Sequence, residues 1–360
     1  MLPRRTICRA VDRAHPDPVR IDDAARLLRE GKLVVFPTET VYGLGAHALD
    51  AAAVADVFAA KGRPSTDPVI VHVAEAGALV FLARVISDEA RVLAARFWPG
   101  PLTLILPKRP EVPGVVTAGL DSVAVRVPSH PVALALLTAA GVPVAAPSAN
   151  RFSRPSPTTA AHALADLDGR VDLVLDAGPT DIGVESTIVD CTVSPPVVRR
   201  AGGVPFDVLA EVVPGLRVSE TVAEVGTSQV APGQLLRHYA PEARVTVYSG
   251  APAQVVARIA RETRTLVAGG TRVGVLAPED DLLALAPELA AVAARGRVEV
   301  ASLGPRRDPT AAARALFAAL RQLDASAVDV ILASGPVTSG LGAAVWDRLR
   351  RAAEGRVIPL

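Results

Sequence analysis

The sequence predicts an α/β (α+β) protein with two domains, a twisted mixed-sheet domain followed by a small Rossmann-like domain with a parallel sheet. Three observations support this prediction. The chain has 360 residues, of which 50% are hydrophobic, and this is enough for two separate cores. Strand patterns outnumber helix patterns between residues 20 and 210, as expected for a mixed sheet. From residue 244 onward strands and helices alternate, as in a doubly wound parallel sheet.

The elements of the first domain follow from apolar periodicity and from their end signals. Asp50 and Ser87 are good N-cap residues, and Gly62 stands just past the helix that Asp50 begins. We expect helices over residues 21–30, 51–61, 87–97, 130–140 and 158–166. We expect strands over residues 33–36, 69–73, 102–106, 122–127, 142–146, 171–175, 186–190 and 196–200.

The predicted domains are residues 1–212 and 243–360, with a linker or lid over 213–242. Little periodicity and many Gly, Pro, Ser and Thr residues indicate the linker, but its segment PGQLLRHYAP is too specific for a plain spacer. Beyond it, RVTVYSG, RVGVLAP, VEVASLG and VDVILASG read as strands, with helices near 251–263, 280–294, 309–323 and 340–354. No glycine fingerprint opens these helices, so we expect no dinucleotide there.

Charge and cysteine content exclude several classes of protein. A net charge of +1 gives no general reason to expect nucleic-acid binding. The only cysteines, Cys8 and Cys191, argue against a disulfide framework and fit a reducing compartment. The N-terminus lacks the apolar region of a signal peptide, and no run approaches the ~18 apolar residues of a spanning helix. We therefore expect a cytoplasmic protein without membrane contact.

Polar side chains gather where the first strands end. The strand at 33–36 runs into Pro37-Thr38-Glu39-Thr40, and Lys61-Gly62-Arg63-Pro64 precedes the strand that carries His72. Alternation places Val69, Val71 and Val73 on one face of that strand and His72 on the other. His72 could be a satisfied core residue, but the nearby cations favour a site for a charged, polyfunctional small molecule.

Further polar groups follow later strands. In SVAVRVP the valines share a face, which leaves Arg126 on the other face, where it could point to water or clamp a carboxylate or phosphate. The sequences APSAN, SRPSPTT and ESTIVD supply hydroxyls, and VVRRAGG supplies Arg200. Together these cations and hydroxyls suit a triphosphate and a carboxylated substrate. Walker, CxxC, HExxH and GxSxG motifs are absent, which favours catalysis by positioning and charge neutralisation over a covalent nucleophile.

The ordered motifs PTETVYGLG, KGRP, IVHV, WPGPLT, SVAVRVP, APSAN with SPTT, ESTIVD and RRAGG carry a resemblance to a known family. The chain resembles the YrdC-like threonylcarbamoyl-AMP synthases in their long, two-domain form. The resemblance implies that L-threonine, bicarbonate and ATP, with Mg²⁺, give threonylcarbamoyl-AMP and pyrophosphate. This nucleotidyltransferase reaction is the first step toward threonylcarbamoyladenosine at position 37 of tRNA. It also implies downstream tRNA threonylcarbamoyl-transfer proteins as partners, with a weak tRNA contact as a further possibility.

The resemblance also implies roles for individual residues. Lys61, Arg63 and Arg126 would act in catalysis, and Arg126 would take the threonine carboxylate. The threonine-binding residues would be Thr38, Thr40, His72, Arg126, Ala146 and Ser186. The ATP-binding residues would be Lys61, Arg63, Asp67, Ser122, Ser148, Asn150, Ser156, Arg200, His238 and Tyr239. His238 and Tyr239, from the linker, would close the site as a lid.

Two positions depart from the family pattern. Asp67 stands where the family usually has Asn, and its carboxylate would oppose phosphate unless it faces Mg²⁺ or solvent. Ser153 stands where glycine is common, and we expect only a small conformational adjustment there.

Two other functions are compatible with parts of the sequence. An RNA-binding protein without synthase activity could use a concave basic surface, although few aromatic residues are available for stacking. An enzyme forming carbamoyl-AMP from carbamoyl phosphate would usually carry acylphosphatase and zinc-finger segments, and neither is recognisable here.

Overall fold

The computed structural model describes residues 5–219, 226–293 and 297–360. Residues 220–225 of the predicted linker and residue 294 of a predicted helix therefore lie outside the described residues. The contacts divide the chain into one unit of Met1–Phe152 with Ser156–Gln234 and another of Ser153–Pro155 with Leu235–Leu360. In the described ranges no helix combines the length and the apolar character needed to cross a membrane.

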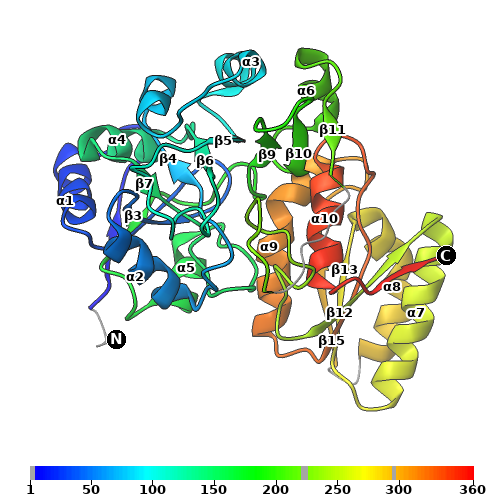
Figure 1. Cartoon of the computed structure of the whole chain (residues 1–360). Helices are drawn as coiled ribbons and strands as arrows, with labels where there is room; N and C mark the ends of the chain where they lie inside the picture. Colours follow the sequence, from blue (N-terminus) through cyan, green and yellow to red (C-terminus); the bar gives the residue numbers. More distant parts are fainter. Residues whose placement is uncertain (1–4, 220–225, 294–296) are drawn as a thin grey trace. The chain divides into compact units, whose positions relative to one another are not determined.

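The first unit is built on a mixed sheet, as predicted. The order of its eleven described strands is β1-β8-β2-β3-β7-β4-β6-β5-β9-β10-β11, with both parallel and antiparallel neighbours (Figure 1). The strands are β1 (Ile7–Ala10), β2 (Val34–Phe36), β3 (Gly43–His47), β4 (Val71–His72), β5 (Leu102–Pro107), β6 (Ser122–Arg126), β7 (Val144–Ala145), β8 (Leu173–Asp176), β9 (Thr187–Asp190), β10 (Val197–Arg200) and β11 (Arg217–Val218).

Two helices of this unit, α2 and α3, begin or end at the signals seen in the sequence. The Asp50 carboxylate accepts hydrogen bonds from the first turn of α2, and Gly62 ends that helix in the left-handed conformation, at φ +66°. Ser87 caps α3 through its hydroxyl. The helices are α1 (Pro18–Arg29), α2 (Ala51–Lys61), η1 (Ala76–Phe81), α3 (Asp88–Phe97), α4 (Pro131–Ala140), α5 (Ala160–Leu167) and α6 (Phe206–Val212).

Side-chain alternation along the strands separates the core from the polar face of the sheet. Val34 and Phe36 pack with α1 and α4, which lie side by side in Figure 1, whereas Leu33 and Val35 pack with α2 and α5. On β4 and β6 the valines all enter one core cluster. His72 and Arg126 therefore share the opposite face, and β4 pairs with β6 in a register that sets the two residues side by side. The sequence alone did not show whether the faces that carry His72 and Arg126 meet, and the pairing of β4 with β6 shows that they do.

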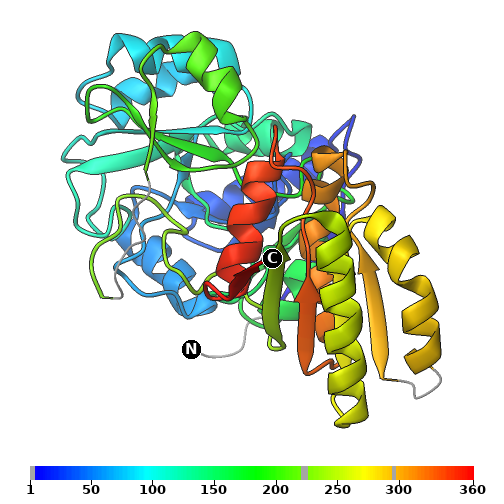
Figure 2. The same cartoon turned by 90° about the vertical axis from the view of Figure 1, so that its right-hand side faces the viewer.

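The second unit is a five-stranded parallel sheet with the strand order β14-β13-β15-β12-β16. Helices α7 and α8 cover one face, and α9 and α10 cover the other (Figures 1 and 2). Its elements are β12 (Arg244–Ser249), α7 (Pro252–Ala268), β13 (Val273–Ala277), α8 (Glu279–Ala293), β14 (Val298–Ser302), α9 (Pro309–Ala325), β15 (Val330–Ala333), α10 (Gly342–Ala352) and β16 (Val357–Pro359). The predicted strand–helix alternation is confirmed.

Six elements were not predicted: β1, β3, η1, α6, β11 and β16. For β3 the physical reason is clear, because its sequence GLGAH has two glycines and no β-branched residue. Space, not propensity, decides its composition: a Cβ on Gly45 would lie 2.8 Å from the Phe36 ring and 2.9 Å from a Val144 methyl. The glycine lets β3 fit between β2 and β7.

Candidate active site

The turn after β2 and the end of β6 are joined by Arg126. Its side chain is buried and donates to Thr40 Oγ1 at 2.9 Å, to Glu39 Oε1 at 2.5 Å and to the Gly100 carbonyl at 3.2 Å. Thr40 Oγ1 in turn lies 2.8 Å from Thr38 Oγ1. Arg126 thus does not point to water. A guanidinium has five N–H donors, so two remain for a ligand after these three bonds.

His72 lies beside Arg126 as a neutral, buried imidazole. Burial and the neighbouring Arg126 lower the pKa of His72 to about 3, so the ring is uncharged near neutral pH. Its Nδ1 has no hydrogen-bond partner among the described residues. A buried polar atom of this kind is costly unless a ligand or water satisfies it, which favours the functional interpretation of His72.

Lys61 ends α2 with its ammonium held against the loop that follows β7. Its Nζ donates to the carbonyl oxygens of Ser148 and Asn150, each at 2.5 Å. The loop itself is aligned by Gly43, whose backbone bridges to Ser148. Lysine is almost never fully buried without partners, and this one is 1% exposed. The loop therefore positions a cation next to small polar groups.

Arg63 and Arg200 form the other cationic part of the site, around Asp67. Arg63 lies 3.0 Å from Asp67 Oδ1 and donates to the carbonyls of Asp67 and Pro68. Burial raises the pKa of Asp67, while Arg63, Lys61 and Arg200 oppose that rise. Asp67 is 0% exposed, which excludes the possibility that its carboxylate faces solvent. Its pairing with Arg63 makes it the counter-ion of the cations.

Hydroxyls of the following strands connect to the same group. Ser186 Oγ lies 2.7 Å from Thr103 Oγ1 and accepts a hydrogen bond from Arg200 at 3.2 Å. Ser156 is buried and donates to Glu185 Oε1 at 2.5 Å. Part of the predicted linker also belongs here, since Arg200 donates to the Pro232 carbonyl at 3.3 Å.

The remaining predicted residues lie in different places. Ala146 follows β7 and its amide donates to Ile70, next to the strand of His72. Ser122 begins β6, about 13 Å along the strand from Arg126, and is half-buried. His238 and Tyr239 pack within the second unit, where the Tyr239 ring lies 5.4 Å from Phe317 and 5.1 Å from the Arg348 guanidinium.

The structure adds residues that the sequence did not assign. Glu39 binds Arg126 and also accepts from the Ser129 amide at 3.1 Å, so it orients the guanidinium. Glu185 and Thr103 hold Ser156 and Ser186. Signals for them were present, since Glu39 lies inside PTET, Glu185 precedes Ser186, and Thr103 is a lone polar residue in an apolar strand. Ser153 has φ +66°, the conformation that glycine would adopt easily.

The arrangement offers two adjoining sets of groups. Arg126, His72 and the Thr38–Thr40 hydroxyls can hold a small molecule with a carboxylate and a hydroxyl. Lys61, Arg63 and Arg200 can neutralise several negative charges at once, as phosphate groups require. The described residues hold no group of three His, Cys, Asp or Glu side chains that could bind a metal by themselves.

The chain is similar to known proteins over nearly its whole length. A family described as "Telomere recombination" (Sua5/YciO/YrdC) matches residues 26–202, and one described as "Threonylcarbamoyl-AMP synthase, C-terminal domain" matches 205–354. The chain is 46% identical to the threonylcarbamoyl-AMP synthase of Pyrococcus abyssi, over 94% of this chain and 95% of that protein. It is 42% identical to that of Bacillus subtilis, over 99% of this chain and 100% of that protein.

Solved structures show the same similarity in three dimensions. The crystal structure of Pyrococcus abyssi Sua5 with L-threonine superposes with a TM-score of 0.89 at 44% identity, covering 98% of this chain and 99% of that one. A variant of the same protein, in which a histidine and the tyrosine after it are replaced by alanine, gives a TM-score of 0.88, covering 99% and 98%.

Proposed function

The chain belongs to the threonylcarbamoyl-AMP synthases, and we propose that it joins L-threonine, bicarbonate and ATP into threonylcarbamoyl-AMP and pyrophosphate. It is an enzyme of nucleotidyltransferase type that serves tRNA modification. The observation that carries the proposal is the juxtaposition of Arg126 and His72 across β4 and β6, together with three buried cations gathered around Asp67, in a chain that matches such synthases over nearly its whole length. Nothing in these relatives favours an RNA-binding protein without synthase activity.

Threonine would bind at the β4–β6 side of the site. The two remaining N–H donors of Arg126 take the substrate carboxylate, and neutral His72 offers its unpartnered Nδ1 to a polar group of the substrate. Thr38, Thr40 and Ser186 surround them with hydroxyls, and Ala146 contributes backbone. The threonine bound to the Pyrococcus protein supports threonine as the substrate.

ATP would bind along the cations. Lys61, Arg63 and Arg200 neutralise the phosphates, with Ser148, Asn150 and Ser156 providing the polar loop around the nucleotide. Asp67 keeps Arg63 in place between its carboxylate and the Pro68 carbonyl. Ser122 lies far along β6, and its part in nucleotide binding stays a prediction.

The reaction has two bond-forming steps. The deprotonated amine of threonine adds to the carbon of bicarbonate, water leaves, and a carbamate results. A carbamate oxygen then attacks the α-phosphorus of ATP, and the bond to the β-phosphate oxygen breaks with pyrophosphate taking the electron pair. The protein's contribution is to hold the carboxylate at Arg126, to exclude water from the labile carbamate, and to neutralise the charge that gathers on pyrophosphate.

Mg²⁺ fits this site as a companion of the triphosphate. Such ions usually keep several waters and bind one or two carboxylates together with substrate phosphates. Asp67 is the carboxylate that lies among these cations and would bind the ion. Mg²⁺ would then compete with Arg63 for this carboxylate. When bound, the ion would polarise the phosphates and ease departure of pyrophosphate.

His238 and Tyr239 would complete the site as a lid. The pair occurs once in this sequence, and its relative carries a double replacement of a consecutive His-Tyr pair, which supports a function for it. The first unit ends at Gln234, shortly before the pair, and its last residues are held in place: Ser228 Oγ donates to the Ala118 carbonyl, and the Gln229 amide donates to the Thr66 carbonyl. Arg200 also donates to the Pro232 carbonyl, so the pair shortly follows a segment that contacts a cation of the site.

The test is pyrophosphate release from purified protein with ATP, bicarbonate and L-threonine. We expect release to need both threonine and bicarbonate, and carbon-13 bicarbonate to label the product's carbamoyl carbon. L-valine, which has the shape of threonine without its hydroxyl, is the matched control and should support much less release. Threonine-independent release would rule out the proposed reaction.

Two further expectations accompany the proposal. The unstable product must pass to a protein that transfers the threonylcarbamoyl group to tRNA, so such proteins are the expected partners, and a direct tRNA contact stays a prediction. A reducing, cytoplasmic location also stays a prediction, supported by the fact that Cys8 and Cys191 are both unpaired.

A further inference from the structure

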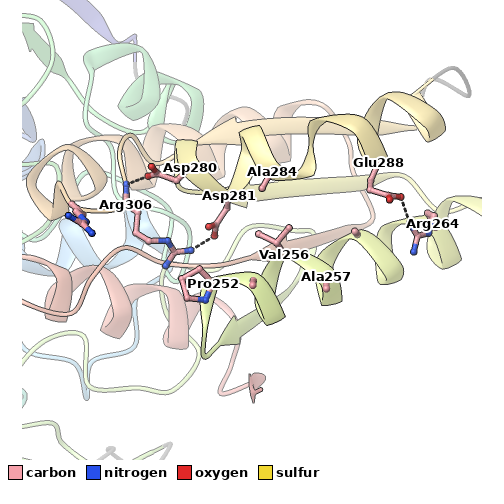
Figure 3. A pocket seen from close by; sticks show the side chains of 12 residues that line it. Pro252, Val256, Ala257, Arg264, Asp280, Asp281, Ala284, Glu288 and Arg306 are labelled. Carbon is pink, nitrogen blue, oxygen red and sulfur yellow. Dashed lines mark hydrogen bonds and ion pairs between the residues drawn. The ribbon is translucent and has the colours of Figure 1, made fainter.

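A groove lies on the second unit between α7 and α8, at the carboxyl ends of the parallel strands. Its volume is about 690 Å³, and it is lined by residues of α7, residues of α8 and the loop after β14 (Figure 3). In open parallel sheets, ligands bind outside the carboxyl ends of the strands, and a volume of this size is typical of small-molecule sites. The proposed synthase reaction uses none of the residues that line the groove.

Arg306 makes the head of the groove rigid by joining the loop after β14 to the start of α8 and to the loop after β15. Its guanidinium pairs with the buried Asp281 and donates to the Gly335 carbonyl at 3.2 Å, and its backbone amide donates to Asp280 Oδ2 at 2.7 Å. Ser334 Oγ also donates to Asp281, at 2.9 Å. A head fixed by this many contacts costs little to organise when a ligand binds.

The charges that line the groove balance, but two of them are not used in ion pairs. Arg306 pairs with Asp281 at the head, and Arg264 pairs with Glu288 at the far end, as Figure 3 shows. Among the described residues, Asp280 and Arg307 form no ion pair, and Arg307 is exposed. One anion, Asp280, and one cation, Arg307, therefore remain for a ligand. Arg307 follows Arg306 in the sequence, and the Arg306 amide donates to Asp280.

The wall between these ends is apolar and made of small side chains. It consists of Pro252, Ala253, Val256, Ala257, Ala260 and Ala284. Because alanines leave the wall smooth, the groove can accept an aliphatic body without a clash. A phosphate is a poor fit, because Glu279, Asp280 and Asp281 form an acidic first turn of α8 at the head.

We propose that this groove binds a small zwitterion with an aliphatic body, of the chemical class of the apolar α-amino acids. The ammonium group lies at Asp280, the carboxylate at Arg307, and the aliphatic chain along the alanines of α7 and α8. The site is separate from the threonine site, and the inference does not depend on the synthase reaction.

The test is calorimetric titration of the full chain with L-leucine, alongside L-leucinamide and N-acetyl-L-leucine, each of which lacks one of the two charges. We expect leucine to bind with a Kd below about 1 mM, and each analogue to bind at least about tenfold more weakly. Asp280→Asn and Arg307→Gln should each weaken leucine binding by about tenfold or more. Arg297→Gln, which removes an exposed arginine just before β14, at the amino ends of the strands and thus opposite the groove, should not change it.

Arg126→Ala separates this site from the threonine site. Leucine binding that survives in Arg126→Ala and is lost in Asp280→Asn and Arg307→Gln supports the groove. Leucine binding that is lost in Arg126→Ala and retained in the groove variants would mean that the threonine site is the only amino-acid site. That result would overturn the proposal. So would binding of both analogues as tightly as leucine, or no saturable binding of leucine, valine or methionine. Threonine-dependent pyrophosphate release should be normal in both groove variants, so failure here leaves the proposed reaction untouched.

Discussion

Replacement of Arg126 tests the threonine site most directly. Three of the five N–H donors of Arg126 bind Glu39, Thr40 and Gly100, so the substrate carboxylate can take the other two. Loss of that charge-assisted, two-point contact should cost about 2–3 kcal/mol of binding free energy. At about 1.4 kcal/mol per factor of ten, the Kd of L-threonine should rise about 30- to 140-fold in Arg126→Ala.

The same substitution affects folding, and the design must separate the two effects. Arg126→Ala leaves the Glu39 carboxylate, whose side chain is 6% exposed, without its cation, which typically costs about 3–5 kcal/mol. The double variant Arg126→Ala with Glu39→Gln removes that buried charge. It should recover much of the free energy of unfolding without regaining threonine affinity.

The assay is calorimetric titration with L-threonine, combined with urea unfolding of each variant. Arg199→Ala is the matched control, because Arg199 pairs with Asp190 on β9 and β10 and has no role in the proposed site. A folded double variant whose threonine Kd stays within about threefold of the unsubstituted protein would refute the assignment of Arg126.

Three further substitutions test the burial and charge of particular residues. His72 has a folded pKa of about 3 and an ordinary unfolded value near 6.5, so its contribution to the free energy of unfolding is complete above about pH 6.5. That contribution is lost as the pH falls toward 3, by up to about 1.4 kcal/mol per pH unit. Urea unfolding at pH 7 and 5 should show a smaller loss of stability in His72→Leu than in the unsubstituted protein, and an unchanged loss in His15→Gln. Gly45→Ala should destabilise the protein by about 1–3 kcal/mol in denaturant unfolding, whereas Gly114→Ala, which has space for a Cβ, should not; equal effects would contradict the close packing of β3. Asp67→Asn removes a negative charge from among three cations and should lower the Kd of ATP in equilibrium binding, and weaker ATP binding would instead show that Asp67 acts mainly by holding Arg63.

Local signals made much of the fold predictable. Asp50 and Gly62 mark the two ends of α2, which was predicted at the residues where it lies, and Ser87 does the same for the start of α3. The second unit was readable because each of its first four strands is a compact apolar run followed by a long helix. The strand β3 was not readable, because its glycines are dictated by Phe36 and Val144, residues that only the folded sheet brings close.

The site was predictable in its residue types but not in its internal contacts. Alternation placed His72 and Arg126 each opposite the valines of its own strand, but only the pairing of β4 with β6 sets the two residues side by side on one face. The partnership of Glu39 with Arg126 spans 87 residues of sequence, and no local pattern encodes such a contact. The burial of Asp67 was likewise invisible, because it depends on Arg200 and Gly233 from distant segments.

The outermost strands of both sheets bear on the solubility of the protein. β1 and β11 carry Arg9 and Arg217, β14 carries Glu299, and β16 ends in Pro359. An unpaired strand edge is a template on which a second chain can add, and short length, charge and proline all discourage such addition. These strands have two to five residues each, too few to seed a long ladder between molecules. Concentrated preparations should therefore resist β-mediated aggregation, and removing Arg9 or Glu299 should weaken that resistance while leaving the chemistry of the site unchanged.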